Sequence, residues 1–593
     1  MADLRSKPIN GKTLFFTTSP RTPFKVLPEI KLLVEHLEGE VWTPETQTKF
    51  YRLLVENDFF EGAESKTPAL SARDRINRLP KALGLITLPI VGLSDAGREL
   101  LESENNQEEI LLRQLLKFQL PSPYHPLGKA ATDYNVKPYL EILRLIYDLD
   151  GLAFDELHIF AMQLVNVERY DEIVAKVRKF RIQKEENKGK YKEFKQKVFE
   201  EEARAIYEDE IAAGDIRTRE SITTTVKAFL DKKIRNLRDY SDAVVRHLRT
   251  TGIVQATAVG KTLTIAPDRR KDVEYILSTV SRKPVFLNDV TAYQNYLFNP
   301  AIPKLLTDDR DKIMDKLRAD FGVTPSPSLS LNQLKDLLKK KIEERKEGRI
   351  AKQVKELKDY TLYNEIESTF DTMNSSYEPS LFFEWNTWRA MTMLNGGEIK
   401  ANLKFDDEGQ PMNTALGNMA DIVCNYGDFD VTVEVTMAKG QLQFKMEGEP
   451  VPRHIGKHKE ETKKPTYCFF IAPTINPATV AHFYTLYVSN VEMYGGKCCI
   501  IPLTLDTFRK MLRSAVEAPV RPSPANIKKL FETSKQYAKE CLISDGTETD
   551  WYNRITETAS NWLDDTNWTS EPSSPYSSFP IAAEPQTPYS NPN

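Results

Sequence analysis

A single stretch of the sequence, MADIVCNYGDFDVTVEVT from Met419 to Thr436, constrains the fold more than any other. Gly427 and Asp428 suit a two-residue turn, and the residues on either side alternate between apolar and polar, as the two strands of a β-hairpin do. This register places Asp421 directly opposite Glu434. Directly opposed residues have Cβ atoms about 5 Å apart, and two carboxylates at that spacing repel each other unless a proton or a cation intervenes. The stretch therefore predicts a β-hairpin with a metal site on one face.

A third acid supports the metal interpretation. Glu384 lies in the aromatic run FFEWNTW, within a predicted helix at Leu381–Leu394, and a buried carboxylate there is costly without a partner. Simpler alternatives stay open for both features. The hairpin acids could only solvate an exposed face, and Glu384 could be an ordinary acid of an amphipathic helix. The expected apolar face of the hairpin holds Ile422, Cys424, Tyr426, Phe429, Val431, Val433 and Val435, and the polar face holds Asp421, Asp430, Thr432 and Glu434.

The segments after the hairpin alternate between helices and strands. YCFFIA and CCIIPL are short, continuous apolar runs, which is typical of strands buried on both faces. With the preceding helix and the hairpin, they predict a small mixed sheet between helices. The expected elements are helices at Gln443–Thr462, Pro477–Ser489 and Leu505–Ala515 and strands at Tyr467–Ala472 and Lys497–Thr504.

Carboxylates grouped in this way suit phosphodiester hydrolysis. The reaction needs an in-line hydroxide and neutralised charge on the phosphate, and one or two Mg²⁺ ions held by carboxylates provide both. Asp421 and Glu434 fit the few protein ligands that Mg²⁺ prefers. Many nucleases with this arrangement carry a lysine two residues after the second acid to position the water, but here Thr436 holds that place. Glu447 is the first candidate to orient the water instead, and His454 and Lys445 are the next candidates.

The N-terminal half repeats one plan. Ser71–Ser103 and Asp242–Leu277 each read as a basic helix, a turn, a strand pair and another helix, which is the order of a winged helix. Gly84 and Gly252 would end the first helix of each copy, and Tyr139–Leu164 predicts a further helix-turn-helix. Winged helices also serve as protein-interaction modules, but two Arg-rich copies favour DNA, because Arg grips phosphates and guanine edges. The candidate DNA-binding residues are Arg21, Arg73, Arg75, Arg78, Lys117, Arg246 and Arg249.

Charge is unevenly distributed, although the formal net charge is only −4. Ten Lys and Arg against four Asp give Ser221–Arg270 a local net charge of +6, which would suit a phosphate backbone. Asp308–Asn374 alternates Glu and Lys around a leucine stripe and predicts a helical linker. From Cys541 onward, eight acids and one Arg give a net charge of −7. This Pro- and Ser-rich tail is expected to be partly disordered, and it either shields the basic groove or is merely solvated.

Size and composition limit the class of protein. A chain of 593 residues is too long for one core and suggests several domains. With 40% hydrophobic and 28% charged residues, no membrane span and no apolar signal-peptide core, the sequence predicts a cytoplasmic protein. The five cysteines lack CxxC spacing, which disfavours a zinc site or a disulfide framework.

The catalytic stretch resembles a known enzyme family. FEWNTW, GNMADIVCNYGDFDVTVEVTMAKGQLQFKMEGEPVPRH, CFFIAPTIN and IIPLTL are similar to the cleavage domain of the AlwI family of type IIS restriction endonucleases, which includes the BstNBI-type nicking enzymes. SPRTP, SARDR and LLKFQLPSPYH resemble its recognition domain, and the likeness runs from about residue 10 to residue 540. In this family Thr also follows the second acid, whereas Ala420 stands where Pro usually precedes the first. By matching position, the resemblance implies Asp421 and Glu434 as metal ligands, supported by Glu384, Glu447 and His454.

These inferences predict a multidomain α+β protein of four parts. They are a DNA recognition domain with tandem winged-helix subdomains at 1–290, a helical linker at 291–375, a restriction-endonuclease-like PD-(D/E)xK cleavage domain at 376–545 and an acidic tail at 546–593. The expected cofactor is Mg²⁺, with Mn²⁺ as a substitute, held by Asp421, Glu434 and Glu384.

The expected activity is that of a prokaryotic restriction enzyme. It would cleave double-stranded DNA a few bases to one side of a short asymmetric site, which the resemblance suggests is of the GAGTC or GGATC kind. One such site cuts one strand at a time, so cutting both needs a homodimer on DNA, a small nuclease subunit or two sequential events. Two alternatives stay open: a strand-specific nicking enzyme or large subunit of a heterodimer, and a non-catalytic winged-helix DNA-binding regulator.

Overall fold

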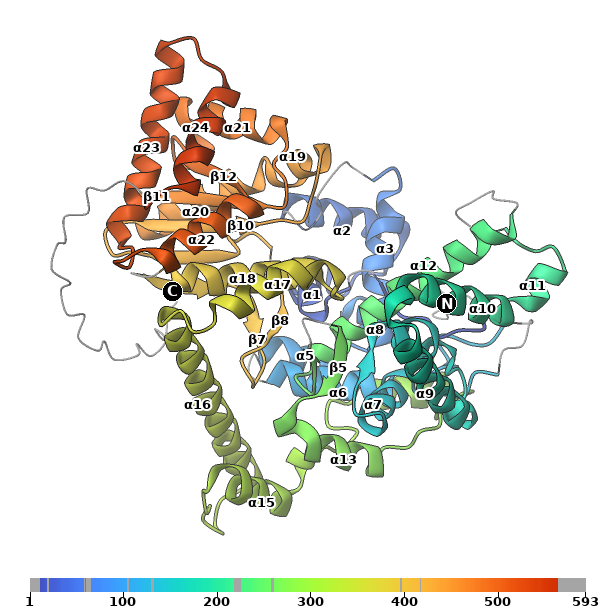
Figure 1. Cartoon of the computed structure of the whole chain (residues 1–593). Coiled ribbons are helices and arrows are strands. Elements are labelled where there is room, and N and C mark those ends of the chain that lie inside the picture. Colours follow the sequence, from blue (N-terminus) through green and yellow to red (C-terminus); the bar gives the residue numbers. More distant parts are fainter. Residues whose placement is uncertain are drawn as a thin grey trace.

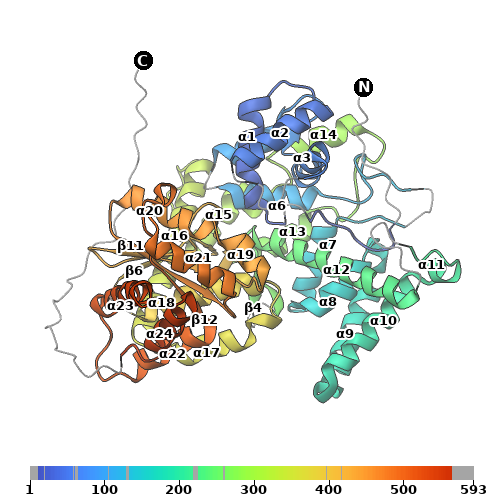
Figure 2. The ribbon, with the colours of Figure 1, turned by 90° about the horizontal axis from the view of Figure 1, so that it is seen from above.

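The computed structural model describes residues 11–563, apart from 19–20, 58, 60–64, 104–105, 129–132, 218–224, 258–260, 395–396 and 416. The N-terminal half, blue and green in Figure 1, is mostly helical, and the C-terminal half, yellow to red, contains the largest sheet. Seen from above in Figure 2, the two halves lie side by side. The long helix α16 (Leu331–Lys358) leads from the first half into the second. Within the described ranges, no helix is both long and apolar enough to cross a membrane.

The C-terminal half is built on a five-stranded mixed sheet in the order β12-β11-β10-β9-β6. Strands β6, β9 and β10 are antiparallel neighbours, whereas β10, β11 and β12 are parallel. This confirms the small mixed sheet between helices that the sequence predicts. The strands are β6 (Glu398–Ala401), β9 (Ile422–Asn425), β10 (Asp430–Val435), β11 (Thr466–Ala472) and β12 (Ile500–Thr504), and a separate hairpin consists of β7 (Lys404–Phe405) and β8 (Pro411–Asn413).

The hairpin β9–β10 has the predicted register. Asn425 pairs with Asp430 and Ile422 with Val433, which sets Asp421 opposite Glu434 just beyond the paired residues. The apolar face packs into the core of the C-terminal half, as expected. The acid-bearing face is also covered, because α20 (Pro450–Thr462) lies against it and hydrogen-bonds to its acids. The alternative in which these acids merely solvate an exposed face is therefore wrong.

Strand β11 is buried on both faces, as its continuous apolar sequence predicts. Phe469 and Ile471 belong to the larger core, with the helices α18 (Pro379–Met393) and α22 (Leu505–Glu517). Cys468 and Phe470 point to the opposite face and pack in a smaller core with α21 (Pro477–Val488).

The single helix expected at Gln443–Thr462 is two helices. Helix α19 (Gln441–Glu447) ends before Gly448, and α20 begins at Pro450. Proline has no backbone N–H and is disfavoured inside a helix but well suited to its first turn, so Pro450 starts a new helix. The break separates two candidate catalytic residues, since Glu447 lies on α19 and His454 on α20.

The C-terminal half continues past residue 545, where the sequence predicts that the cleavage domain ends. Helices α23 (Pro524–Ile543) and α24 (Glu548–Ser560) pack together, and Trp551 of α24 is fully buried. The indole of Trp551 donates a hydrogen bond to the carbonyl oxygen of Ser534 at 3.2 Å. The apolar residues of α24 recur at helical spacing, and the acidic composition of the region concealed this signal. The Pro- and Ser-rich end of the predicted tail lies outside the described residues.

If α24 is part of the core, Trp551→Ala will lower the free energy of unfolding by about 3–5 kcal/mol, the usual cost of removing a buried aromatic ring. Chemical denaturation followed by circular dichroism measures this. Arg554→Ala is the matched control on the same helix, because Arg554 is half-exposed and its pair with Glu540 contributes less than about 1 kcal/mol. Equal, small effects of both substitutions would contradict the assignment.

The first predicted winged-helix segment contains helices on either side of a strand pair. Helix α4 ends two residues before Gly84, which has a φ of +67°. A Cβ at this position would lie 2.4 Å from Leu297 Cγ, so glycine is required both by conformation and by space. The elements are α3 (Pro68–Asn77), α4 (Leu79–Ala82), β1 (Ile86–Thr87), β2 (Gly92–Leu93) and α5 (Asp95–Glu102).

The second predicted winged-helix segment and the helix-turn-helix expected at Tyr139–Leu164 form one unit. Strand β5 pairs with β4 on one side and with β3 on the other, in a three-stranded sheet. The sequence gives no sign that the two segments are joined. The strand β3 has only two residues, and its partner β5 lies more than a hundred residues further along the chain. The elements are α7 (Pro138–Asp148), β3 (Leu152–Ala153), α8 (Phe154–Ile159), α12 (Val226–Arg249), β4 (Val254–Thr257), β5 (Thr262–Ile265) and α13 (Arg270–Thr279).

The remaining helices complete the N-terminal half and the linker. In the linker, Leu334 and Leu338 of α16 pack on α15, which confirms the predicted leucine stripe. These helices are α1 (Val26–Leu37), α2 (Pro44–Glu56), α6 (Gln107–Lys117), α9 (Tyr170–Glu186), α10 (Tyr191–Ile206), α11 (Glu208–Ala212), α14 (Val290–Phe298), α15 (Arg310–Phe321) and α17 (Tyr363–Thr372).

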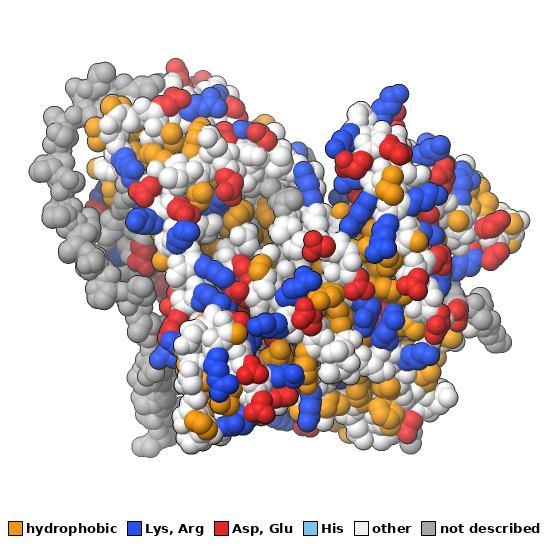
Figure 3. Space-filling view, turned by 60° about the horizontal axis from the view of Figure 1, so that its bottom comes forward, with side chains coloured by type: hydrophobic (Ala, Val, Ile, Leu, Met, Phe, Trp, Pro, Cys, Tyr) orange, Lys and Arg blue, Asp and Glu red, His pale blue; other side chains and the backbone are white. Residues whose placement is uncertain are grey.

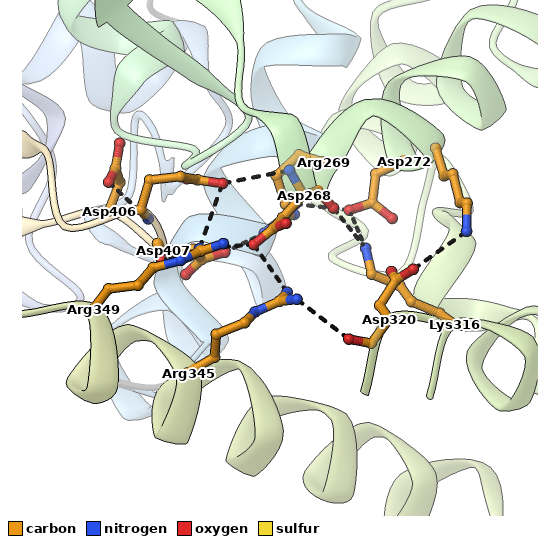
Figure 4. Close-up of polar contacts among 11 residues, drawn as sticks. Asp268, Arg269, Asp272, Lys316, Asp320, Arg345, Arg349, Asp406 and Asp407 are labelled. Atoms are coloured by element: carbon orange, nitrogen blue, oxygen red, sulfur yellow. Dashed lines mark hydrogen bonds and ion pairs between the residues drawn. The ribbon is translucent and has the colours of Figure 1, made fainter. Parts of the chain in front are cut away.

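Ion pairs tie α16 to both halves (Figure 4). Arg345 and Arg349 of α16 reach Asp268, just after β5, at 3.0 and 2.8 Å. Arg349 also donates to the carbonyl oxygen of Asp407, in the β7–β8 loop, at 2.7 Å. Arg269 approaches the side chain of Asp407 at 3.4 Å, so the linker, the N-terminal half and the C-terminal half meet at this loop.

Candidate active site

Three acids from separate elements lie close together: Glu384 on α18, Asp421 just before β9, and Glu434 on β10. The Asp421 carboxylate accepts a hydrogen bond from the N–H of Val435 at 2.7 Å, so its side chain reaches the strand that carries Glu434. The Glu384 carboxylate accepts one from the N–H of Ala415 at 2.9 Å. Glu384 and Glu434 are buried, whereas Asp421 is partly exposed. The three predicted metal ligands thus lie near enough for their charges to interact.

The charges of these acids act on one another. Burial, followed by the charge of Asp421, raises the pKa of Glu384 well above its usual value. Burial, followed by the charge of Glu434, raises the pKa of Asp421 well above its usual value. The pKa of Glu434 is also raised, by burial and by the charge of Glu447. Grouped carboxylates of this kind favour a bound proton or a divalent cation over standing ionised together.

The donor set suits Mg²⁺, a hard cation that prefers oxygen ligands and takes only one or two carboxylates besides water and phosphate. Within the described ranges, no group of three or more His, Cys, Asp or Glu side chains is placed so that it could hold a metal ion as it stands. Few carboxylates with strong mutual repulsion match an open magnesium site more closely than a cage for a structural metal.

His454 and Glu447, the other two candidates, lie beside this cluster. The Nδ1 atom of His454 is 2.9 Å from a carboxylate oxygen of Glu434. Burial, followed by the charge of Arg453, lowers the pKa of His454 to about 4, so its imidazole is neutral at pH 7. When Glu434 is ionised, Nδ1 donates to it and Nε2 is left as the basic nitrogen. Glu447 is half-buried on α19 and close enough for its charge to raise the pKa of both Asp421 and Glu434.

A second histidine–acid pair lies on the same two elements but is neutralised within the protein. His458 Nε2 is 2.9 Å from a carboxylate oxygen of Asp430. Lys464 approaches the other oxygen of Asp430 at 3.5 Å. Because these side chains surround it, Asp430 has less need of a metal ion than the three acids of the cluster.

Two contributors to the site had no signal in the sequence. Lys25 comes from the N-terminal half, and its charge lowers the pKa of both Glu384 and Asp421. The neighbouring ring of Phe24 packs under the ammonium group of Lys404 on β7, at 4.0 Å, which holds this segment against the C-terminal half. Gln443 is buried and bonds to the backbone of Ala438, Thr474 and Asn476, which fixes the loops around the site. Only tertiary contacts bring these residues to the acids.

The sequence from residue 82 to residue 511 matches the model of the AlwI restriction endonuclease family. The chain belongs to the AlwI restriction endonuclease family. Its members are DNA-cleaving hydrolases, so the family identifies the class of reaction. The match includes all five candidate catalytic residues.

Two solved structures show weak likenesses to this AlwI-family chain. One is the small subunit (R.BspD6I2) of the heterodimeric restriction endonuclease R.BspD6I, 23% identical, which covers 34% of this chain and 96% of that one with a TM-score of 0.27. The other is the BpuJ1 endonuclease binding domain in complex with pyrene- and phenanthrene-modified DNA, 15% identical, covering 48% of this chain and 96% of that one with a TM-score of 0.33. No curated protein sequence matches the chain. The family assignment rests on the sequence match alone.

For a DNA-binding enzyme of the AlwI family, the exposed arginines are of interest. Arg21, Arg73 and Arg78 are each nearly half-exposed. Arg73 and Arg78 pair with Asp74, and Arg21 pairs with the exposed Asp239 and the buried Asp242. Arg75 is more buried and pairs with Glu29, and Arg246 is partly buried. On the face shown in Figure 3, Lys and Arg are scattered among Asp and Glu and form no single basic patch.

Two of the candidate DNA-binding residues have structural roles instead. Lys117 is fully buried and donates to the carbonyl oxygens of Leu297 and Asn299 at 2.9 and 2.6 Å. Burial lowers the pKa of Lys117 to about 7, so much of its charge is lost. Arg249 is equally buried and pairs with Glu378. Both residues hold distant segments together, and neither presents its charge to DNA in this structure.

Proposed function

We propose that the chain is a Mg²⁺-dependent type IIS endonuclease that binds a short asymmetric site in duplex DNA and cleaves a few bases to one side. The observation that carries this proposal is the cluster of Glu384, Asp421 and Glu434, in which Asp421 and Glu434 raise the pKa of Glu384 and Glu434 raises the pKa of Asp421. The family supplies the substrate, and the cluster supplies a place for the metal ion that phosphodiester hydrolysis needs.

Each residue of the cluster has a role in this proposal. Glu384, Asp421 and Glu434 would hold Mg²⁺, which when bound neutralises negative charge on the phosphate. Glu447 would accept a hydrogen bond from the attacking water and orient it. His454, held by Glu434 through Nδ1, would present Nε2 as a proton acceptor near the scissile phosphate. Lys25 adds a positive charge that favours the ionised acids and a nearby phosphate.

The N-terminal half would supply recognition. The order of three helices and three strands in its unit, α7, β3, α8, α12, β4 and β5, supports a winged helix. Arg21, Arg73 and Arg78 are exposed enough to contact phosphates, and a site of the GAGTC or GGATC kind fits the family resemblance. The linker α15–α16 would set the distance between the bound site and the cut.

Cleavage of both strands would need either a second such site or a second cleavage event. The part of the chain that the structure describes carries one acid cluster of this kind, and one cluster would hydrolyse one strand at a time. A homodimer on DNA, a small nuclease subunit or two sequential cuts would each solve this. A strand-specific nicking enzyme, or the large subunit of a heterodimer, is therefore the second candidate function, with the same chemistry.

Supercoiled plasmid incubated with the protein and Mg²⁺ separates these functions. Discrete linear fragments would establish a double-strand cutter, and open circles that persist would establish a nicking enzyme or a missing subunit. Absence of any Mg²⁺-dependent product on several plasmids would contradict the proposal and favour a non-catalytic DNA-binding regulator. Sequencing the new ends gives the recognition site and the cut offset.

His454 offers a test with a matched control on the same helix. His454→Ala is expected to slow cleavage by about 10²-fold or more, because a positioned proton acceptor is lost. His458→Ala removes the neighbouring pair with Asp430, which has no proposed part in the chemistry, and is expected to leave the rate within about two-fold. Single-turnover cleavage of plasmid measures both, and equal rates in the two variants would remove His454 from the proposed mechanism.

A further inference from the structure

Two segments hold the carboxylate of Glu384 in place. The first is α18 itself, which carries the residue. The second is the segment after β8, where the N–H of Ala415 donates to Glu384 at 2.9 Å. A change in the position of either segment therefore moves this acid relative to Asp421 and Glu434.

One side chain of the recognition half holds both segments. The guanidinium of Arg249, at the C-terminal end of α12, pairs with Glu378 immediately before α18. Its Nε donates to the carbonyl oxygen of Met412 on β8 at 2.8 Å. Glu378 is six residues before Glu384, and Met412 is three residues before Ala415. Both Arg249 and Glu378 are almost fully buried, so loss of Glu378 would leave the buried charge of Arg249 without its carboxylate partner.

The start of α18 is built into the recognition half. Glu378 is the N-cap residue of α18, yet its side chain makes no capping hydrogen bond to the helix and pairs with Arg246 and Arg249 of α12 instead. The preceding residue, Tyr377, packs its ring against Phe154 of α8 and belongs to the hydrophobic core of the N-terminal half. The acid-bearing helix thus begins inside the domain that would bind DNA.

A series of ion pairs connects Arg249 and Glu378 to the surface of the protein. Arg246 bridges Glu378 and Asp242, and it lies 3.1 Å from Asp242. Asp242 also accepts from Arg21 at 3.0 Å, and Arg21 is nearly half-exposed. A phosphate that approached Arg21 or Arg246 would compete with Asp242 for these guanidinium groups.

The β7–β8 hairpin is held from its other side as well. Figure 4 shows Arg269 and Arg349 reaching Asp407 in the loop that joins the two strands. With Arg249 on Met412, residues outside the cleavage domain hold this hairpin both at the loop that joins its strands and along β8, three residues before Ala415.

We propose that Arg249 and Glu378 are positioning residues for Glu384, and that through them the recognition half sets the geometry of the nuclease site. The inference rests on the proposed function, because it takes Glu384 as a metal ligand. It gives the recognition half a part in cleavage beyond delivering the enzyme to its site.

The test is the affinity of the full chain for Mn²⁺ alone, measured by electron paramagnetic resonance. Arg249→Lys keeps the charge but loses the planar fork that bonds Glu378 and Met412 together. The dissociation constant for Mn²⁺ is expected to rise by about ten-fold, as when a residue that orients a metal ligand is lost. Arg282→Lys is the matched control, since Arg282 grips the buried Glu141 of the same half at 2.9 and 2.6 Å without contacting α18 or β8. Its Mn²⁺ affinity is expected to stay unchanged.

A double-mutant cycle separates positioning from general destabilisation. Glu384→Gln alone should weaken Mn²⁺ binding, and Arg249→Lys should then add little, because it has no carboxylate left to position. An equal further loss in the Glu384→Gln background, or the same Mn²⁺ affinity for Arg249→Lys and Arg282→Lys, would overturn the inference. If Arg249→Lys fails to fold, the isosteric Glu378→Gln is used in the same cycle with the same expectations. Unchanged Mn²⁺ binding in Glu384→Gln would instead overturn the role of Glu384 in the proposed function.

Discussion

Asp421→Asn is expected to abolish cleavage while leaving affinity for DNA that carries the recognition site within about two-fold. The substitution keeps the size of the side chain and its hydrogen bond from the N–H of Val435, but it removes the charge that would hold the metal ion. Metal ions contribute several kcal/mol of transition-state stabilisation, so the rate should fall by at least about 10³-fold. The affinity for DNA is expected to be maintained because the proposed function assigns recognition to the other half of the chain.

Single-turnover cleavage in Mg²⁺ and DNA binding in Ca²⁺ measure the two parts of this prediction. Asp428→Asn is the matched control, because Asp428 lies at the exposed turn of the same hairpin and pairs with Lys528 at 2.7 Å. It should leave both properties unchanged. Loss of binding together with cleavage in Asp421→Asn would count against separate recognition and cleavage functions.

Glu384→Gln is expected to make the metal-free protein more stable at pH 8 while it impairs cleavage. Burial and the charges of Asp421 and Glu434 raise the pKa of Glu384, so its ionised form is unfavourable in the folded state. A neutral amide avoids this cost, so the free energy of unfolding is expected to increase. Active sites commonly trade stability for function in this way.

The pH dependence gives the sign of this effect. A carboxyl group whose folded-state pKa is raised stabilises the fold while it is protonated and loses that contribution as pH rises through the raised pKa. The advantage of Glu384→Gln should therefore be small near pH 5 and grow toward pH 8, in urea unfolding with EDTA present. Glu398→Gln, at an exposed position on β6, should show no such trend. An advantage that is larger at low pH would contradict the electrostatic account of the cluster.

The sequence was most informative where the structure depends on neighbouring residues. Alternation around Gly427 sets both the register of β9–β10 and the pairing of Asp421 with Glu434, because a hairpin leaves its two strands few other ways to meet. The continuous apolar run of β11 reflects burial on both faces in the same direct way. Glu384 could be proposed because a lone acid among aromatic residues is unusual in any helix.

Contacts between distant segments could not be read from local patterns. Arg249 and Lys117 look like surface cations of amphipathic helices, and only the packing of α18, β8 and α14 against them shows that they are buried. Lys25 reaches the acid cluster from the other half of the chain. The short strand β3 can be recognised as part of a sheet only because β5 pairs with it. In each case the deciding contact joins residues whose separation in sequence carries no periodic signal.

The most direct test of the central claim is the position of the metal ion. Crystals of the protein soaked in Mn²⁺ can be measured at the manganese absorption edge, where the anomalous difference map locates the ion independently of the refined coordinates. The account predicts a peak between the carboxylates of Glu384, Asp421 and Glu434, about 2.0–2.2 Å from the oxygens that bind it. A well-occupied Mn²⁺ peak elsewhere in the molecule, with these three acids free of metal, would contradict it.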